Sequence, residues 1–324
     1  MRILVTGATG KIGAGVTRLL VERGDDVVAL VRHPARAHAS VPEAAAPVVG
    51  DVTDPSSLRR AAEGCEAVVN CMGLFEQWVP DPAVFDRVNA EGARNVVVAA
   101  RDAGARRVVH TSTIDVFDAE PGGTVSERAL ATHPKGTAYE RSKQRAEELV
   151  LGEADGIEVV LVNPASVYGP GPWAEAGLDS AIRDAIRRRL PALPPGGMSL
   201  VFADDAARAH VAALDRGRAG ERYVLAGGYA SAREIVAIAV DEAGRGWVPP
   251  TIPAPAARGL AIAGEGIARL IRRRPLVARG QVEFLLWRAR ADSTRARDEL
   301  GVEFVAPDEG IRRTVRWMIE TARV

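Results

Sequence analysis

The chain has 324 residues, 47% of them hydrophobic and 26% charged, and its 42 Lys and Arg residues balance 42 Asp and Glu residues. This length suits one large or two ordinary globular domains, and a net charge of zero gives no overall field that would attract nucleic acid or an anionic membrane. Cys65 and Cys71 make neither a disulfide framework nor a zinc pattern, so no metal site is expected. The first residues lack the pattern of a secretory signal and no apolar run is long enough to cross a membrane, so we expect a cytoplasmic protein without a membrane partner.

Alternating apolar segments predict the fold class. Six short runs of β-branched and aliphatic residues predict buried strands at 2–7, 25–32, 46–51, 65–73, 106–113 and 157–164. Amphipathic stretches at 11–23, 89–103 and 138–152 predict helices. Strands that alternate with helices indicate right-handed βαβ units, so we predict an α/β fold with a Rossmann-type, doubly wound parallel sheet.

The segment TGATGKIG, residues 6–13, connects the first predicted strand to the first predicted helix. Gly7 permits a tight turn, Gly10 lets the backbone approach a pyrophosphate, and Gly13 lets the helix lie close to the sheet. A strand, a glycine turn and a helix in this order predict a dinucleotide-binding turn.

The end of the second predicted strand bears on which dinucleotide is bound. An NAD-selective site places a carboxylate about twenty residues after the glycine turn, but Val31 and Arg32 occupy that place here. The Arg32 guanidinium suits a ribose phosphate, so NADP(H) is the expected cofactor and NAD(H) the alternative; a solvated loop arginine is the other interpretation. Asp51 after the third strand suits the adenine amino group or an ordinary turn.

Tyr139 and Lys143 are four residues apart and share one face of the helix predicted over 138–152. A phenol with a pKa of about 10 is a weak acid–base group at neutral pH, so an adjacent ammonium that favours phenolate would help it work. Lys143 is one of only three lysines among the 42 basic residues, and the segment HTST, residues 110–113, precedes the pair. The sequence therefore predicts an acid–base pair here.

After Pro164 the sequence becomes rich in proline and glycine, as in GPGPW, RRRLPALPPGG and VPPTIPAPAARG. Such segments between short helical stretches predict a smaller, irregular C-terminal lobe. We expect residues 1–164 with 200–226 to form the dinucleotide-binding Rossmann domain. The smaller substrate-binding lobe would then comprise residues 165–199 with 227–324.

Jointly these segments resemble the extended short-chain dehydrogenase/reductase family, also described as the NAD-dependent epimerase/dehydratase family. The resemblance covers nearly the whole chain and is carried by TGATGKIG, GDVTD, VNAEGARNV, YERSK, NPASVYGP, VFADDAARAH and ADSTRARDELG. It implies an NAD(P)-dependent enzyme that acts on a small-molecule substrate. Because helices beside the active-site helix often pair in this family, the resemblance also suits a homodimer.

The family's functional residues carry over to matching positions of this sequence. Tyr139 would be the acid/base, Lys143 would lower its pKa and hold the nicotinamide ribose, and Asn89 would steady the active site. Thr113 stands where the family usually has serine and keeps the hydroxyl, although Ser112 beside it is the alternative. The implied cofactor-binding residues are Gly7, Thr9, Gly10, Lys11, Ile12, Gly13, Arg32, Asp51, Val52, Cys71, Met72, Gly73, Thr111, Tyr139, Lys143, Pro164, Ala165 and Val167.

Two departures from the sugar-modifying members indicate the branch. Ile114 occupies the place of the aspartate that acts in dehydratases, and Asn163-Pro164 replaces an arginine and an aromatic residue. With LVRHPAR, residues 30–36, this is more similar to the dihydroflavonol reductase-like branch.

We therefore expect hydride transfer between NADP(H) and a ketone, aldehyde or alcohol. The alternatives are a nucleotide-sugar epimerase and a dinucleotide-binding regulatory or assembly protein. Phe75, Trp78 and Trp173 would offer apolar walls to a ring-containing substrate, or else pack the lobes together. Asp115 would touch the substrate, or else cap a helix or face solvent.

Overall fold

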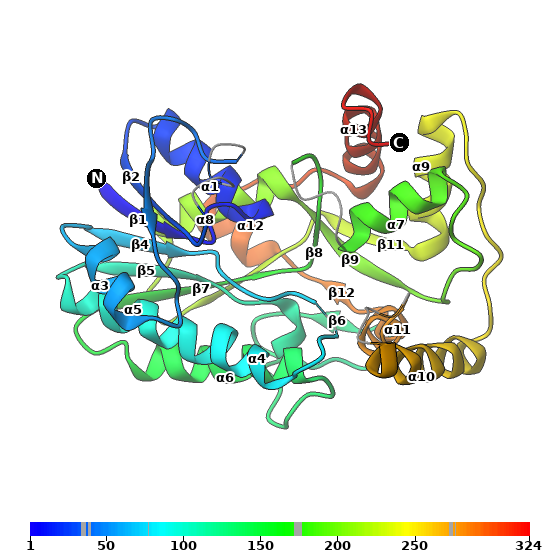
Figure 1. Cartoon of the computed structure of the whole chain (residues 1–324), viewed down its shortest axis with the longest axis horizontal. Coiled ribbons are helices and arrows are strands. Elements are labelled where there is room, and N and C mark those ends of the chain that lie inside the picture. Colours follow the sequence, from blue (N-terminus) through cyan, green and yellow to red (C-terminus); the bar gives the residue numbers. More distant parts are fainter. Residues whose placement is uncertain (34–36, 38–39, 77, 172–176, 272–274, 276) are drawn as a thin grey trace.

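A seven-stranded sheet forms the centre of the computed structural model, which describes residues 1–33, 37, 40–76, 78–171, 177–271, 275 and 277–324 (Figure 1). The strand order is β10-β7-β5-β4-β1-β2-β3, and every pairing is parallel. The strands are β1 (Arg2–Thr6), β2 (Asp26–Val31), β3 (Ala46–Val49), β4 (Ala67–Asn70), β5 (Arg107–Thr111), β7 (Glu158–Pro164) and β10 (Arg222–Leu225). The predicted Rossmann-type sheet and its six strands are confirmed, and β10 is a seventh strand.

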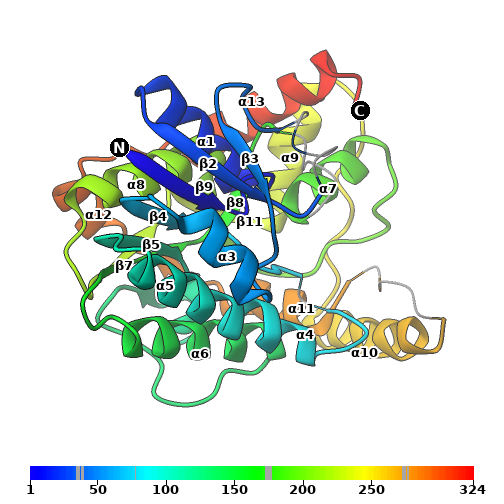
Figure 2. The ribbon, with the colours of Figure 1, turned by 60° about the vertical axis from the view of Figure 1, so that its left-hand side comes forward.

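Helices cover both faces of this sheet (Figure 2). One face packs against α1 (Lys11–Glu22) and α8 (Ala203–Arg216), and the other against α3 (Pro55–Ala62), α5 (Gly92–Asp102) and α6 (Ala138–Gly152). Side chains of a strand alternate between faces, so Ile3 and Val5 join the first core whereas Leu4 joins the second. Each face of the sheet therefore has its own hydrophobic core.

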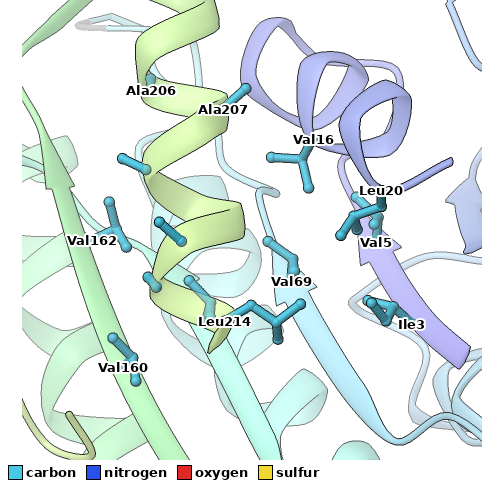
Figure 3. Packing of buried hydrophobic residues seen from close by; sticks show 14 of the residues in the cluster. Ile3, Val5, Val16, Leu20, Val69, Val160, Val162, Ala206, Ala207 and Leu214 are labelled. Atoms are coloured by element: carbon cyan, nitrogen blue, oxygen red, sulfur yellow. The ribbon is translucent and has the colours of Figure 1, made fainter. Parts of the chain in front are cut away.

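The core under α1 and α8 is built largely from small and β-branched side chains. Figure 3 shows Val16 and Leu20 of α1 and Ala206 and Ala207 of α8 over the strands. The two helices approach so closely that a Cβ on Gly15 would lie 2.8 Å from the Ala207 Cβ. Such close packing fixes α1, and with it the turn that precedes α1.

The predicted helices differ in how regular they are. The predicted helix at 138–152 is confirmed as α6, which begins with a capping box between Thr137 and Glu140. The helix predicted to start at residue 89 instead begins as a π-helical segment, η1 (Asp86–Glu91), preceded by α4 (Ala83–Phe85) and followed by α5. A π-helical turn contains more residues than an α-helical turn and is typical of functional sites. This irregularity leaves no signal in the spacing of the apolar residues.

The smaller lobe is built around a three-stranded sheet in the order β11-β9-β8, with β8 (Ser166–Tyr168), β9 (Gly197–Phe202) and β11 (Gly228–Ser231). Helices α7 (Gly177–Ile186), α9 (Ala232–Ala243) and α13 (Pro307–Glu320) complete its core. The division of the chain at 199/200 stays a prediction. In the structure β9 spans that point. Helix α12 (Thr294–Leu300), which the prediction places in the smaller lobe, packs against helix α8 and against strand β10 of the large sheet.

A further layer lies beyond the carboxyl end of β5. There β6 (Thr124–Val125) pairs with β12 (Arg290–Ala291), and α10 (Ala254–Ile271) packs against α11 (Arg279–Trp287). Phe284 and Trp287 of α11 pack against the core cluster that contains Ile114 and Phe117. Within the described residues, none of the helices has the length and apolar character needed to cross a membrane.

Candidate active site

The glycine turn lies at the carboxyl end of β1. Gly7 has a φ of 64°, a left-handed conformation that favours glycine, and a Cβ there would lie 2.7 Å from the Cys71 carbonyl oxygen. The Gly10 N–H donates to the Gly7 carbonyl at 2.8 Å, and Gly13 lies against that same carbonyl without room for a side chain. The turn therefore brings the N-terminus of α1 to the edge of the sheet without intervening side chains, an arrangement that suits a pyrophosphate.

The sheet order places this turn at the crevice where ligands bind in such folds. The chain runs outward from β1 to β2 and β3 on one side, and from β4 to β5 and β7 on the other. This reversal makes the carboxyl ends of β1 and β4 the topological switch point. The residues present at that point fit a dinucleotide.

Lys11, the first residue of α1, joins the glycine turn to the smaller lobe. Its Nζ donates to the Gly169 carbonyl at 2.7 Å and pairs with the Asp179 carboxylate. Asp179 is only 1% exposed and also accepts from the Gly169 N–H at 3.2 Å. Burial raises the pKa of Asp179, while the Lys11 ammonium lowers it. The sequence predicts that Lys11 binds the cofactor. In the structure its ammonium is bonded to Gly169 and Asp179 of the smaller lobe.

The other predicted cofactor residues lie at or just beyond the carboxyl ends of the strands. Arg32 is exposed and directly follows β2, and Asp51 accepts from the Thr53 N–H and hydroxyl at 2.8 and 2.7 Å, as an ordinary turn aspartate does. The Thr111 hydroxyl bonds the His210 ring at 2.8 Å. Thr9, Ile12, Cys71, Met72 and Val167 are half-buried, Gly73 is exposed, and Val52, Pro164 and Ala165 are buried.

Tyr139 and Lys143 lie one turn apart on α6 and are both buried. Lys143 Nζ donates to the Thr111 carbonyl at 2.8 Å, and the Thr113 hydroxyl hydrogen-bonds the Tyr139 phenol. The Tyr139 ring meets the Phe85 ring edge-on, with centroids 6.1 Å apart. The structure thus brings together three of the four residues predicted to be catalytic.

Burial and neighbouring charges determine where protons reside at this site. Burial raises the pKa of Tyr139, the Asp115 carboxylate raises it further, and the Thr113 hydrogen bond lowers it. Burial lowers the pKa of Lys143 to about 8, against the opposing effect of the Glu147 carboxylate. The phenol therefore carries its proton at neutral pH. A lowering of the phenol pKa by Lys143 stays a prediction.

The two candidate hydroxyls differ in their surroundings. Thr113 Oγ1 accepts from the Asp115 N–H at 3.2 Å and bonds Tyr139, which places it in the cluster. The Ser112 hydroxyl is buried and has no hydrogen-bond partner among the residues that the structure describes. The geometry therefore favours Thr113 as the active-site hydroxyl.

Asp115 lies in the short 3-10 helix η2 (Ile114–Val116) and is 5% exposed. Its Oδ1 has no hydrogen-bond partner within the described part of the chain. Burial raises the pKa of Asp115 to about 7 and Glu140 adds to this, while the Thr113 hydrogen bond and the Lys135 and Lys143 ammonium groups lower it. A buried carboxyl with spare hydrogen-bonding capacity beside Thr113 is suited to meet a polar group of a substrate.

We expect Asp115→Asn to stabilise the protein most at alkaline pH. The pKa of Asp115 is raised on folding from 3.8 to about 7, so its contribution to stability is present at low pH and lost as pH rises through about 7. Asparagine stays neutral, so the Tm difference between variant and unmodified protein should widen from about pH 5 to about pH 9, followed by circular dichroism. Asp118→Asn, at an exposed position, is the control. A Tm difference that is constant with pH would contradict this expectation.

Asn89 holds the loop after β4 against α6. Its Oδ1 accepts from the Leu74 N–H at 2.7 Å, and its Nδ2 donates to the Leu74 carbonyl and to the Ser142 hydroxyl, both at 3.0 Å. A Cβ on Gly73 in the same loop would lie 3.4 Å from Lys143 Nζ. Asn89 thus fixes a backbone segment close to Lys143, and the steadying role predicted for it stays a prediction.

A buried network that we did not predict supports the site. Glu147, one turn beyond Lys143 on α6, accepts from Asn163 Nδ2 at 2.8 Å and from Arg222 Nε at 2.6 Å. Asn163 Nδ2 also donates to the Thr113 carbonyl at 3.1 Å. The network joins α6, β7 and β10 to Thr113, the residue predicted to carry the active-site hydroxyl. The sequence offered one signal for this network: Tyr139, Lys143 and Glu147 follow one another at intervals of four residues, which places them on one face of α6.

The aromatic residues predicted to meet the substrate differ in exposure. Phe75 is 57% exposed and Trp78 is half-buried, both in the segment between β4 and α4. Trp173 lies outside the described residues. Exposure at Phe75 suits an apolar wall more than packing between the lobes.

The described residues offer no other obvious reactive centre. Among them, no group of three or more His, Cys, Asp and Glu side chains is placed to hold a metal ion. Burial raises the pKa of the Cys71 thiol to about 12, so the thiolate needed for nucleophilic chemistry is scarce at neutral pH. At this edge of the sheet, the role predicted for the Tyr139 cluster stays a prediction.

Comparison with known proteins agrees with this geometry. Residues 3–226 match the model of the NAD dependent epimerase/dehydratase family. The whole chain is similar to sterol demethylase protein B of Methylococcus capsulatus, with 31% identity over 328 positions that cover 100% of both chains. It is also similar to a putative dihydroflavonol 4-reductase of Synechocystis sp., with 28% identity over 97% of this chain and 93% of the relative.

Among solved structures, the fold is similar to that of DesIV, a dTDP-glucose 4,6-dehydratase from Streptomyces venezuelae with NAD bound. The TM-score is 0.80 at 25% identity, and the match covers 100% of this chain and 98% of that chain. The predicted resemblance, including the dihydroflavonol reductase-like branch, is confirmed. The chain therefore belongs to the NAD-dependent epimerase/dehydratase family of extended short-chain dehydrogenases/reductases and is an NAD(P)-dependent oxidoreductase or epimerase.

Proposed function

We propose that this enzyme reduces a carbonyl group on a small apolar molecule with NADPH, and that Tyr139 supplies the proton to the substrate oxygen. The observation that carries the proposal is the buried cluster of Tyr139, Thr113 and Asp115, in which the phenol keeps its proton at neutral pH. Reduction of a carbonyl needs an acid in place at the start, whereas oxidation of a sugar alcohol in an epimerase begins with a base. The protonation state favours reduction.

Each residue of the cluster has a distinct part in this reaction. The glycine turn would hold the dinucleotide, which would supply the hydride when bound. Thr113 and Tyr139 donate hydrogen bonds to the substrate oxygen and hold it beside the phenolic proton. Lys143, whose ammonium already bonds the Thr111 carbonyl, would hold a ribose hydroxyl with a second donor. Asp115 would bind a second polar group of the substrate through its unpartnered oxygen.

Three features support an apolar, ring-containing substrate. Ile114 is a buried apolar side chain where dehydratases place an acid, which removes the group needed to eliminate water. Phe75 offers an exposed aromatic face between β4 and α4. The Methylococcus relative is named for a sterol and the Synechocystis relative for a dihydroflavonol, both of which are ring molecules.

The test separates reduction from epimerisation. The protein is incubated with NADPH and a panel of cyclic ketones and aldehydes, and absorbance of the reduced nicotinamide is followed. In parallel, it is incubated with nucleotide sugars, and sugar stereochemistry is followed by NMR. We expect stoichiometric NADPH oxidation with at least one ring ketone. Conversion of a nucleotide sugar without net cofactor change, and no oxidation of NADPH, would establish the epimerase alternative instead.

Cofactor choice is expected to depend on Arg32. If its guanidinium binds the ribose phosphate, the protein binds NADPH more tightly than NADH. Arg32→Ala then removes a charge-assisted contact and weakens NADPH binding by about tenfold to a hundredfold, with little effect on NADH. Titration of nicotinamide fluorescence measures both affinities, and Arg245→Ala in the smaller lobe is the matched control. Equal affinity of the unmodified protein for the two cofactors would refute the preference.

A further inference from the structure

Helix α10 is packed with its small side chains inward and its large ones outward. The side chains that it buries are Ala257, Ala261, Glu265 and Ala268. Of the eleven large hydrophobic side chains that are exposed in the described residues, five belong to this one helix: Leu260, Ile262, Ile267, Leu270 and Ile271. Leu270 is 85% exposed. A helix that belonged only to the protein core would show the opposite arrangement.

The exposed side of α10 is continuous and uncharged. Successive residues of a helix are rotated by about 100° around its axis. In order around the axis, the exposed side runs from Ile262 to Leu270, Ile267 and Ile271, which covers roughly half of the helix circumference. The residues between them on this arc are Pro255, Ala256, Gly259, Leu260, Ala263 and Gly266. The charged side chains Arg258 and Arg269 lie at the border of this arc, where they pair with Glu283 and Glu265. With 18 residues, the apolar face is about 27 Å long.

The position of α10 leaves this face open to the outside. Figures 1 and 2 both show α10 at the periphery of the molecule, with α11 as its neighbour. The contact with α11 uses the opposite side, through Ala257, Ala261 and Val282. Within the described residues, the apolar arc is therefore left without a partner.

The side chains of the face, and the charge of the sequence segment that contains α10, point to one occupant. The arc is purely aliphatic and lacks the Trp, Tyr and Arg side chains that anchor protein partners. Residues 254–290 carry eight arginines against two glutamates, a net charge of +6 in a chain whose total is zero. An aliphatic face within a basic segment suits the acyl chains and the anionic headgroups of a lipid surface.

We propose that α10 docks this protein on the surface of a bilayer that contains anionic lipids, with Leu260, Ile267 and Leu270 inserted among the upper acyl chains. The helix would lie in the plane of the interface, and no part of it would cross the membrane. The expectation of no membrane partner rested on the net charge of the whole chain and on the absence of a membrane-spanning segment. Neither criterion detects an apolar helix face that lies in a basic segment. The inference does not depend on the reaction proposed above.

Vesicle co-sedimentation tests the proposal with the full chain. The unmodified protein is mixed with vesicles of phosphatidylcholine alone, or of phosphatidylcholine with phosphatidylglycerol. We expect binding to the anionic vesicles that is at least tenfold tighter than to the neutral ones. The variant Ile267→Glu/Leu270→Glu should bind anionic vesicles at least tenfold more weakly. Ile319→Glu, at a position of α13 that is 45% exposed, should bind as the unmodified protein does.

Two further measurements make every outcome decisive. Circular dichroism melting shows whether each variant is folded, and Leu260→Gln replaces the double variant if the latter is not. Sedimentation velocity without lipid shows whether the face joins two copies of the chain. No binding of the unmodified protein to anionic vesicles, or equal binding by the folded variants, would overturn the proposal. A dimer that the double variant converts to a monomer, without vesicle binding, would assign the face to self-association instead.

Discussion

Replacing Tyr139 with phenylalanine is expected to lower kcat for carbonyl reduction by about a hundredfold or more, while the affinity for dinucleotide stays unchanged. The substitution removes only the hydroxyl that bonds Thr113 and preserves the edge-on contact of the ring with Phe85. The loss should therefore appear in turnover. Steady-state kinetics with the best ketone, together with NADPH titration, separates the two quantities.

A matched control comes from the other lobe. Tyr168 is a fully buried tyrosine whose hydroxyl donates to the Pro307 carbonyl at 3.4 Å, far along the chain from α6. Tyr168→Phe should leave kcat nearly unchanged. Lys143→Ala should weaken both turnover and dinucleotide binding, because Lys143 lies one helical turn from Tyr139 and its ammonium bonds the Thr111 carbonyl at the end of β5, where we propose that the cofactor binds. If Tyr139→Phe keeps most of its activity, another group supplies the proton.

The second large effect is expected at the bridge between the lobes. Lys11→Met leaves the Asp179 carboxylate buried without its cation, and breaking a buried pair in this way costs on the order of 3–5 kcal/mol in the free energy of unfolding. Urea unfolding at about pH 8 measures the loss. The deficit should shrink at acidic pH, because protonation of Asp179 removes the unpaired charge.

A double variant separates the charge from the packing. Lys11→Met/Asp179→Asn removes both charges, so it should recover a large part of the stability that Lys11→Met loses. The interaction free energy from the four proteins then measures the pair itself. Equal stability of Lys11→Met and the unmodified protein at about pH 8 would show that the bridge does not stabilise the fold.

The parts of this structure that follow from short-range patterns were predictable from the sequence. The turn at Gly7, Gly10 and Gly13 has its strand before it and its helix after it, and Tyr139 and Lys143 share a helix face by their spacing alone. In each case the residues that form the pattern lie within a few positions of one another in the sequence. These local signals sufficed for the sheet and for the central pair of the site.

The contacts that join distant segments were not predictable. Arg222 lies 75 positions from Glu147, and the sequence gives no measure of which arginine among so many would reach it. Lys11 meets Asp179 across 168 positions, and its place in the glycine turn gave no sign of this contact; its role in cofactor binding stays a prediction. The apolar pattern of α10 is visible in the sequence, but its orientation is not, because alanines can form the buried side of a helix as well as leucines can.

The scarcity of lysine makes the chain unusual toward amine-directed reagents. Besides the N-terminus, the only primary amines are Lys11, held by Asp179, Lys135, which donates to the Phe117 carbonyl, and Lys143. Arginine does not form stable products with acylating esters, so most of the surface is inert to them. Because its pKa is lowered to about 8, a large fraction of the Lys143 amine is neutral at mildly alkaline pH. Its slow acylation, and protection by dinucleotide, would report active-site occupancy by mass spectrometry without any engineered label.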